Sequence, residues 1–207
     1  MILKIPKYIV MIALMAGLAL TAPEPGAGQT SFEARPESKI VIKGSSTVHD
    51  FDCLSDKIRG QAEIAAEEEE EIQDTVKANS PLDVSILFPV KEFDCGRSRM
   101  NRDFYETLEA EEYEEITFDF ISAKLVDNSS EEFDLYEVSG ILTVAGRERE
   151  IQVEVKGTHQ ENDVIRIEGY HPISMKDFGI DPPTALMGMI QVDDELEVHF
   201  DLRVQAR

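Results

Sequence analysis

The chain has 207 residues, of which 42 are acidic and 20 basic, and its formal net charge is −22. This length suits one domain with an additional segment. So large a negative charge repels phosphate backbones and gains nothing from anionic lipid headgroups, so we expect no nucleic-acid partner and no stable membrane insertion.

The N-terminal segment has the pattern of a secretory signal. Lys4 and Lys7 precede an apolar run over residues 8–20, and small residues follow. This run is shorter than the roughly 20 apolar residues that a membrane-spanning helix needs. We therefore predict a signal peptide at residues 1–28 and an exported protein, with an uncleaved N-terminal anchor as the alternative.

The rest of the chain is predicted to form a linker at residues 29–37 and one folded domain at residues 38–207. The linker belongs to a stretch that mixes Pro, Gly, Ser and Thr. In the domain, apolar and polar residues alternate strictly, in runs that begin at residues 40, 58, 82, 116, 151, 165 and 196. Further candidates lie at 48–53 and 136–144. This period of two predicts antiparallel strands and an all-β sandwich or barrel.

Two local patterns refine this prediction. Ala145 and Gly146 separate two alternating runs and predict a β-hairpin. At residues 103–111, apolar residues at helical spacing follow Asp103, which with Glu106 resembles a capping box, so one short helix is expected there. The acidic run at 67–71 is predicted to be a solvated loop.

Catalytic and metal-binding motifs are absent from the sequence. It contains no HExxH, GxSxG, phosphate-loop or dinucleotide-binding pattern. His49 precedes Asp50, but neighbours in a strand point to opposite faces, which weakens this pair as a catalytic signal. We expect a binding protein without cofactor or metal; an enzyme would require His49 and Asp50 to act on a substrate.

One of the two cysteines, Cys95, adjoins the densest basic cluster of the domain. Cys53 and Cys95 are predicted to form a disulfide in an oxidising compartment, with two free thiols as the alternative. Arg97, Arg99 and Arg102 follow Cys95 and are candidates for binding a phosphate headgroup, because a guanidinium donates two hydrogen bonds to phosphate. Compensation of nearby acidic side chains is the simpler role for these arginines.

Four stretches, in order, resemble motifs of the YceI-like family, the polyisoprenoid-binding proteins of bacterial periplasms. They are GSSTVHDFDC at 44–53, the segment 88–118, GILTVAGRERE at 140–150 and MKDFGIDPPTALMG at 175–188. Glu114 departs from the pattern, since the family has proline after the residue that corresponds to Tyr113. The similarity spans about residues 38–204, nearly the whole domain.

This resemblance implies a lipocalin-like antiparallel β-barrel of about eight strands, periplasmic or secreted in a bacterium. Its interior would hold an isoprenoid lipid, either a polyprenyl phosphate or an isoprenoid quinone, without catalysis. The side chains expected to contact the lipid are Val84, Ile86, Phe88, Phe118, Phe120, Leu142, Val153, Ile167, Val198 and Phe200. An apolar interior is equally typical of a filled core, so a filled barrel acting as a structural or stress-related interaction protein is the alternative. A homodimer is also left open.

One apolar segment stands out near the end of the chain. Met175, Phe178, Ile180, Leu186 and Met187 surround Pro182 and Pro183, which restrict the backbone. We expect these five apolar residues to form a flap over the barrel, because flexible methionines repack readily around a lipid. The alternative is that the segment only closes the end of the core.

Overall fold

The protein is described here by a computed structural model that covers residues 30–64, 75–77 and 82–206. The predicted signal peptide and the acidic run at 67–71 lie outside these residues. Within them, no helix is long and apolar enough to cross a membrane.

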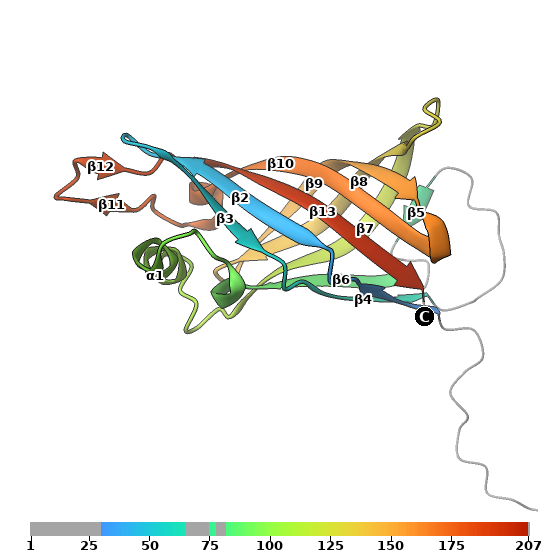
Figure 1. Ribbon diagram of the computed structural model, residues 1–207, viewed down its shortest axis with the longest axis horizontal. Helices are drawn as coiled ribbons and strands as arrows, with labels where there is room; N and C mark the ends of the chain where they lie inside the picture. Colours follow the sequence, from blue (N-terminus) through green and yellow to red (C-terminus); the bar gives the residue numbers. More distant parts are fainter. Residues whose placement is uncertain (1–29, 65–74, 78–81, 207) are drawn as a thin grey trace, which may run out of the picture.

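Eight antiparallel strands form a closed ring (Figure 1). In ring order they are β1 (Thr30–Ala34), β4 (Arg59–Ile64), β6 (Leu82–Pro89), β7 (Glu115–Asp127), β8 (Asp134–Val144), β9 (Arg147–His159), β10 (Val164–Ser174) and β13 (Glu195–Ala206). The ring closes because β13 also pairs with β1, with Ala34 opposite Val204. The predicted barrel of about eight strands is confirmed.

Two further strands lengthen the ring at one end. β2 (Lys39–Ser45) follows β1 in the chain and pairs with the neighbouring part of β13. β3 (Asp50–Ser55) pairs with β2 and precedes β4 in the chain. A short strand, β5 (Thr75–Lys77), pairs with β7. Each alternating run of the sequence coincides largely with a strand, although Val48 and Ile58 lie just before β3 and β4. Alternation favours strands because each strand can bury one face and expose the other.

The predicted linker differs from the structure, since residues 30–34 form β1. This strand pairs with β4 on one side, where Thr30 lies opposite Ile64, and with β13 on the other. Backbone hydrogen bonds to these two strands hold residues 30–34 in the sheet, and such bonds do not depend on the identity of the side chains. Composition alone could not reveal this pairing, because the partner strands are remote in sequence.

The predicted hairpin is confirmed between β8 and β9. Ala145 and Gly146 both have positive φ angles, 46° and 69°. Two such residues give the tight turn whose twist matches that of the flanking strands. This turn sets β8 and β9 in register from Val144 opposite Arg147 to Asp134 opposite Gly157.

The helix begins earlier than predicted, because α1 spans Ser98–Thr107. Its first residues follow the loop of Cys95, and Arg97 supplies the first carbonyl, which accepts from the Asn101 amide at 2.9 Å. Asp103 therefore lies inside the helix and forms no capping box. The helix ends before Glu109, whose φ is 52°. Three short 3-10 helices complete the fold: η1 (Val90–Glu92), η2 (Glu161–Asp163) and η3 (Met175–Phe178).

A two-stranded hairpin extends beyond the barrel at the end where α1 lies (Figure 1). It consists of β11 (Thr184–Ala185) and β12 (Ile190–Gln191). Phe93 and Val90, each 1% exposed, lie at this end beside α1. By contrast, inward-facing residues of the central barrel, such as Phe118 and Phe200, are only half-buried. We call this end of the barrel the helix end.

Candidate functional site

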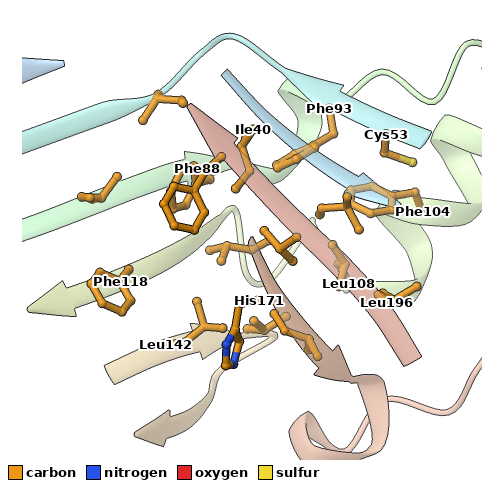
Figure 2. Close-up of a pocket in the computed structure, with 18 of the residues that line it drawn as sticks. Ile40, Cys53, Phe88, Phe93, Phe104, Leu108, Phe118, Leu142, His171 and Leu196 are labelled. Atoms are coloured by element: carbon orange, nitrogen blue, oxygen red, sulfur yellow. The ribbon is translucent and has the colours of Figure 1, made fainter. Parts of the chain in front are cut away.

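The barrel encloses a cavity of about 1200 Å³ (Figure 2). Its lining extends from α1 and the β11–β12 hairpin at the helix end to Ala34, Asp134 and His159 at the opposite end. Typical small-molecule pockets have volumes of about 300–1,000 Å³, so this cavity is large enough for an extended ligand. The interior of the described barrel is hollow, and the filled core is not observed.

All ten side chains that were expected to face the interior lie on the cavity wall. They are Val84, Ile86, Phe88, Phe118, Phe120, Leu142, Val153, Ile167, Val198 and Phe200. Strict alternation places them there, because successive side chains of a strand point to opposite faces of the sheet. The wall is therefore apolar along most of its length.

Glycines on the inner face leave room for aromatic rings beside the wall. A Cβ atom at Gly169 in β10 would lie 2.6 Å from the ring carbon Cζ of Phe200 in β13. A Cβ atom at Gly157 would lie 3.1 Å from the Tyr136 ring. These rings occupy space that a side chain would otherwise fill, which leaves the centre of the barrel open.

The polar side chain of His171 points into the cavity from β10 (Figure 2). Burial lowers the pKa of its imidazole below the usual range, and no nearby charge or hydrogen bond contributes to this shift. The ring is therefore neutral at pH 7 and presents one donor and one acceptor to the cavity. Sequence reasoning did not select His171, although the alternation of β10 through Ile167 and Gly169 continues to this position.

The helix end of the cavity carries charges of both signs. Arg97 and Arg99 lie on its wall, together with Asp103 and Glu106, whereas Arg102 is exposed and away from the wall. Arg99 Nε lies 3.8 Å from a carboxylate oxygen of Asp103. The structure thus brings two of the three predicted arginines to the cavity and supplies acidic neighbours as well.

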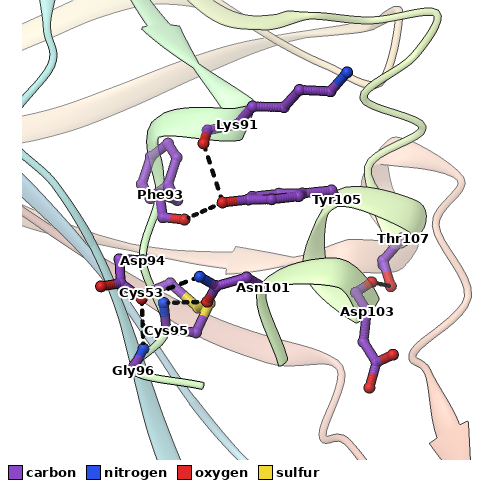
Figure 3. The surroundings of a disulfide bond; sticks show 10 residues. All are labelled: Cys53, Lys91, Phe93, Asp94, Cys95, Gly96, Asn101, Asp103, Tyr105 and Thr107. Carbon is purple, nitrogen blue, oxygen red and sulfur yellow. Dashed lines mark hydrogen bonds between the residues drawn. A yellow bond between two sulfur atoms is a disulfide. The ribbon is translucent and has the colours of Figure 1, made fainter. Parts of the chain in front are cut away.

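The predicted disulfide between Cys53 and Cys95 is confirmed and joins β3 to the loop before α1 (Figure 3). Backbone hydrogen bonds between Leu54 and Asp94, of 2.9 and 2.8 Å, reinforce this junction. The Asn101 side chain accepts from the Cys95 amide at 2.7 Å and donates to the Asp94 carboxylate at 3.1 Å. These contacts fasten the beginning of α1 over the end of the barrel.

Tyr105 fastens the other half of α1 (Figure 3). Its hydroxyl donates to the carbonyl oxygen of Phe93 at 2.7 Å and lies 3.0 Å from that of Lys91. Burial raises the pKa of the Tyr105 phenol, which keeps it protonated as a donor. The ring of Phe104, the preceding residue, packs against the ring of Phe93, with 5.4 Å between the ring centroids, and lines the cavity.

The five predicted flap residues fall into two groups. Met175, Phe178 and Ile180 are buried, belong to the wall and lie in or beside η3. Leu186 lies at the helix end of the wall but is 59% exposed, and Met187 is fully exposed and off the wall. Met175 is held by its amide, which donates to the Asp194 carbonyl at 3.0 Å.

His49, the histidine weighed for a catalytic role, lies just before β3. His49 reaches the helix end of the cavity and is exposed. No group of three or more His, Cys, Asp or Glu side chains suited to a metal ion occurs in the part of the chain that the structure covers.

An antiparallel barrel with an apolar internal cavity defines a lipocalin-like class of protein. The family model of the YceI-like domain matches residues 35–204. The chain therefore belongs to the YceI-like family, as its sequence motifs indicated.

Two solved structures of the same fold come from Burkholderia cenocepacia and Saccharophagus degradans. The Burkholderia cenocepacia protein BcnA is 18% identical, with a TM-score of 0.61 over 82% of this chain and 98% of that chain. A polyisoprenoid binding domain from Saccharophagus degradans, implicated in plant cell wall breakdown, is 14% identical, with a TM-score of 0.60 over 85% of this chain and 98% of that chain. At these identities the similarity establishes the fold. No curated protein matches the chain.

Proposed function

We propose that this protein binds an isoprenoid lipid inside its barrel and serves as a carrier or buffer of that lipid. The observation that carries this proposal is the cavity of about 1200 Å³ with a predominantly apolar wall. Membership of the YceI-like family, and a fold shared with a domain described as polyisoprenoid binding, support the same class of ligand.

A branched hydrocarbon chain suits this cavity for a simple reason. Burial of apolar surface contributes about 25 cal/mol per Å², so several isoprene units provide affinity without a polar anchor. The long axis of the cavity follows the strands, and an extended chain lies along it. The ten wall residues named above would contact the chain.

The headgroup distinguishes the two candidate lipids. A polyprenyl phosphate would place its anionic group at the helix end, within reach of Arg97 and Arg99. An isoprenoid quinone would instead use the neutral imidazole of His171, which donates a hydrogen bond to a carbonyl without adding charge. Both lipids remain within the proposal, and neither requires a cofactor or a catalytic step.

Export belongs to the same proposal. Residues 1–28 would be removed as a signal peptide, and the disulfide between Cys53 and Cys95 fits an oxidising compartment such as a bacterial periplasm.

Native mass spectrometry of the protein purified from producing cells, followed by organic extraction, tests the proposal. A stoichiometric adduct that extracts as a polyprenyl species is the expected result, and its mass separates phosphate from quinone. A bare chain that also takes up neither lipid after incubation would overturn the lipid-binding function.

A further inference from the structure

The β11–β12 hairpin ends in a group of exposed apolar side chains. Leu186 is 59% exposed, Met187 105% and Met189 72%. Val48, in the turn between β2 and β3, is 59% exposed. The adjacent Thr47 donates its amide to the Gln191 carbonyl at 3.0 Å, so the turn and the hairpin are joined. We call Val48, Leu186, Met187 and Met189 the apolar tip.

The backbone of the hairpin turn makes these residues unusual. Leu186 and Met187 have φ angles of 50° and 56°, and Gly188 has 86°. Glycine, asparagine and aspartate are favoured in this left-handed region, whereas large side chains are uncommon there. Met187 gains no burial within the chain in return. An unfavourable conformation that only exposes apolar surface points to a contact outside the chain.

The apolar tip adjoins the cavity. Thr184, Ala185 and Leu186 of the hairpin also line the helix end of the cavity wall. An apolar surface therefore runs from the tip into the barrel. Arg97, Arg99 and Arg102 are exposed at the same end, on α1 and just before it. Arginine complements the phosphate groups of lipid headgroups.

We propose that the apolar tip dips reversibly into the surface of a lipid bilayer, as a peripheral contact and not a stable insertion of the chain, and brings the helix end of the cavity against it. The passage of an isoprenoid ligand through this contact rests on the proposed function; the contact itself does not. Unbranched methionines adapt to a fluid acyl environment. Because the chain carries a net charge of −22, the partner surface is zwitterionic, and added anionic lipid weakens the contact.

Flotation with ligand-free vesicles of phosphatidylcholine and phosphatidylethanolamine tests the contact. The wild-type protein is expected to float with the vesicles. The double variant Met187→Asn, Met189→Asn removes two exposed side chains of the tip that lie off the cavity wall. Asparagine tolerates the left-handed backbone at position 187, so the variant stays folded. Its partition into vesicles is expected to fall about tenfold or more. Val126→Asn is the control, because Val126 is 53% exposed in β7 at the opposite end of the barrel.

Several outcomes would contradict the bilayer contact. It is overturned if wild type does not float, if the double variant floats equally well, or if Val126→Asn has the same effect. It is also overturned if the double mutation abolishes a dimer in solution and wild type shows no flotation, because a second copy then covers the tip.

A second readout separates this inference from the proposed function. Uptake of an isoprenoid quinone from vesicles should slow in the double variant, whereas uptake from detergent solution should equal that of wild type. Equal uptake rates from vesicles would overturn the role of the contact in loading. A wild-type protein that floats but binds no quinone in either format would contradict the proposed function and leave the bilayer contact standing.

Discussion

The ring of Phe118 in β7 occupies the space that a Cβ atom at Gly140 in β8 would fill. Both residues face the barrel interior, and Gly140 pairs with Phe120, two residues further along β7. The missing side chain lets the Phe118 ring lie beside the wall instead of across the centre. Gly169 and Phe200 repeat the arrangement between β10 and β13. This relationship explains how a barrel with so many inward phenylalanines remains hollow.

Replacing Gly140 by alanine should therefore both destabilise the barrel and narrow the cavity. The added methyl overlaps the Phe118 ring and would lie 2.8 Å from the Asp119 carbonyl oxygen. Overpacking of this kind costs about 1–3 kcal/mol, which urea denaturation measures. Lipid loading, measured by native mass spectrometry, should fall as well. Gly60→Ala is the matched control, because its nearest atoms would be 3.8 Å away; an equal loss in both variants would contradict the explanation.

The disulfide should contribute substantially to stability. Cys53 and Cys95 are separated by 42 residues, and closing a loop of that length corresponds to about 4 kcal/mol in the chain-entropy model. The double variant Cys53→Ser, Cys95→Ser should show a lower free energy of unfolding by up to this amount in urea. Dithiothreitol should destabilise wild type and leave the variant unchanged. A variant as stable as oxidised wild type would show that the contacts of Asn101 suffice to hold α1.

His171 should discriminate between lipids by their headgroups. Removing one hydrogen bond to a neutral acceptor typically costs about 0.5–1.5 kcal/mol, so His171→Leu should weaken binding of an isoprenoid quinone by up to about tenfold. Binding of squalene, which has no polar group, should stay equal or improve. His171→Asn, which keeps a donor, is expected to retain part of the preference. Titrations of each variant with the quinone and with squalene check this prediction. If His171→Leu weakened squalene binding as much as quinone binding, the cause would be altered packing of the cavity wall.

The ion pair between Arg166 and Asp201 should make stability depend on pH in the acidic range. Arg166 donates from Nε and Nη2 to the two carboxylate oxygens at 2.9 Å each. The hydrogen bond from Arg166 lowers the pKa of Asp201 in the folded state. The stability that this pair contributes is therefore fully present above the pKa of an aspartate in the unfolded chain, about 3.9. It is lost as the pH falls through the lower pKa that Asp201 has in the folded protein.

The test is Asp201→Asn, compared with wild type in urea from pH 7 downward. At pH 7 the variant should unfold with a free energy lower by about 1–2 kcal/mol, as expected for a charge-assisted hydrogen-bonded pair. The difference should shrink under acid conditions where Asp201 is protonated in both states. A difference that stays constant with pH would contradict the role of the ionised carboxylate.

The sequence by itself determined most of the barrel strands and the family. Alternation of apolar and polar residues is a local property, so it placed β2, β6 and β13 and the ten wall residues without knowledge of their partners. Ala145 and Gly146 likewise specified their turn through backbone preference alone. The cysteine pair followed from the expected compartment and was confirmed.

Only the tertiary structure decided whether the barrel is filled or hollow. That outcome depends on contacts across strands, such as Phe118 against Gly140, which no single segment contains. The strand β1 depends in the same way on remote partners, and the start of α1 depends on the anchored loop of Cys95. The exposure of Met187 also became visible only in three dimensions, because an apolar residue in a sequence does not reveal whether anything covers it.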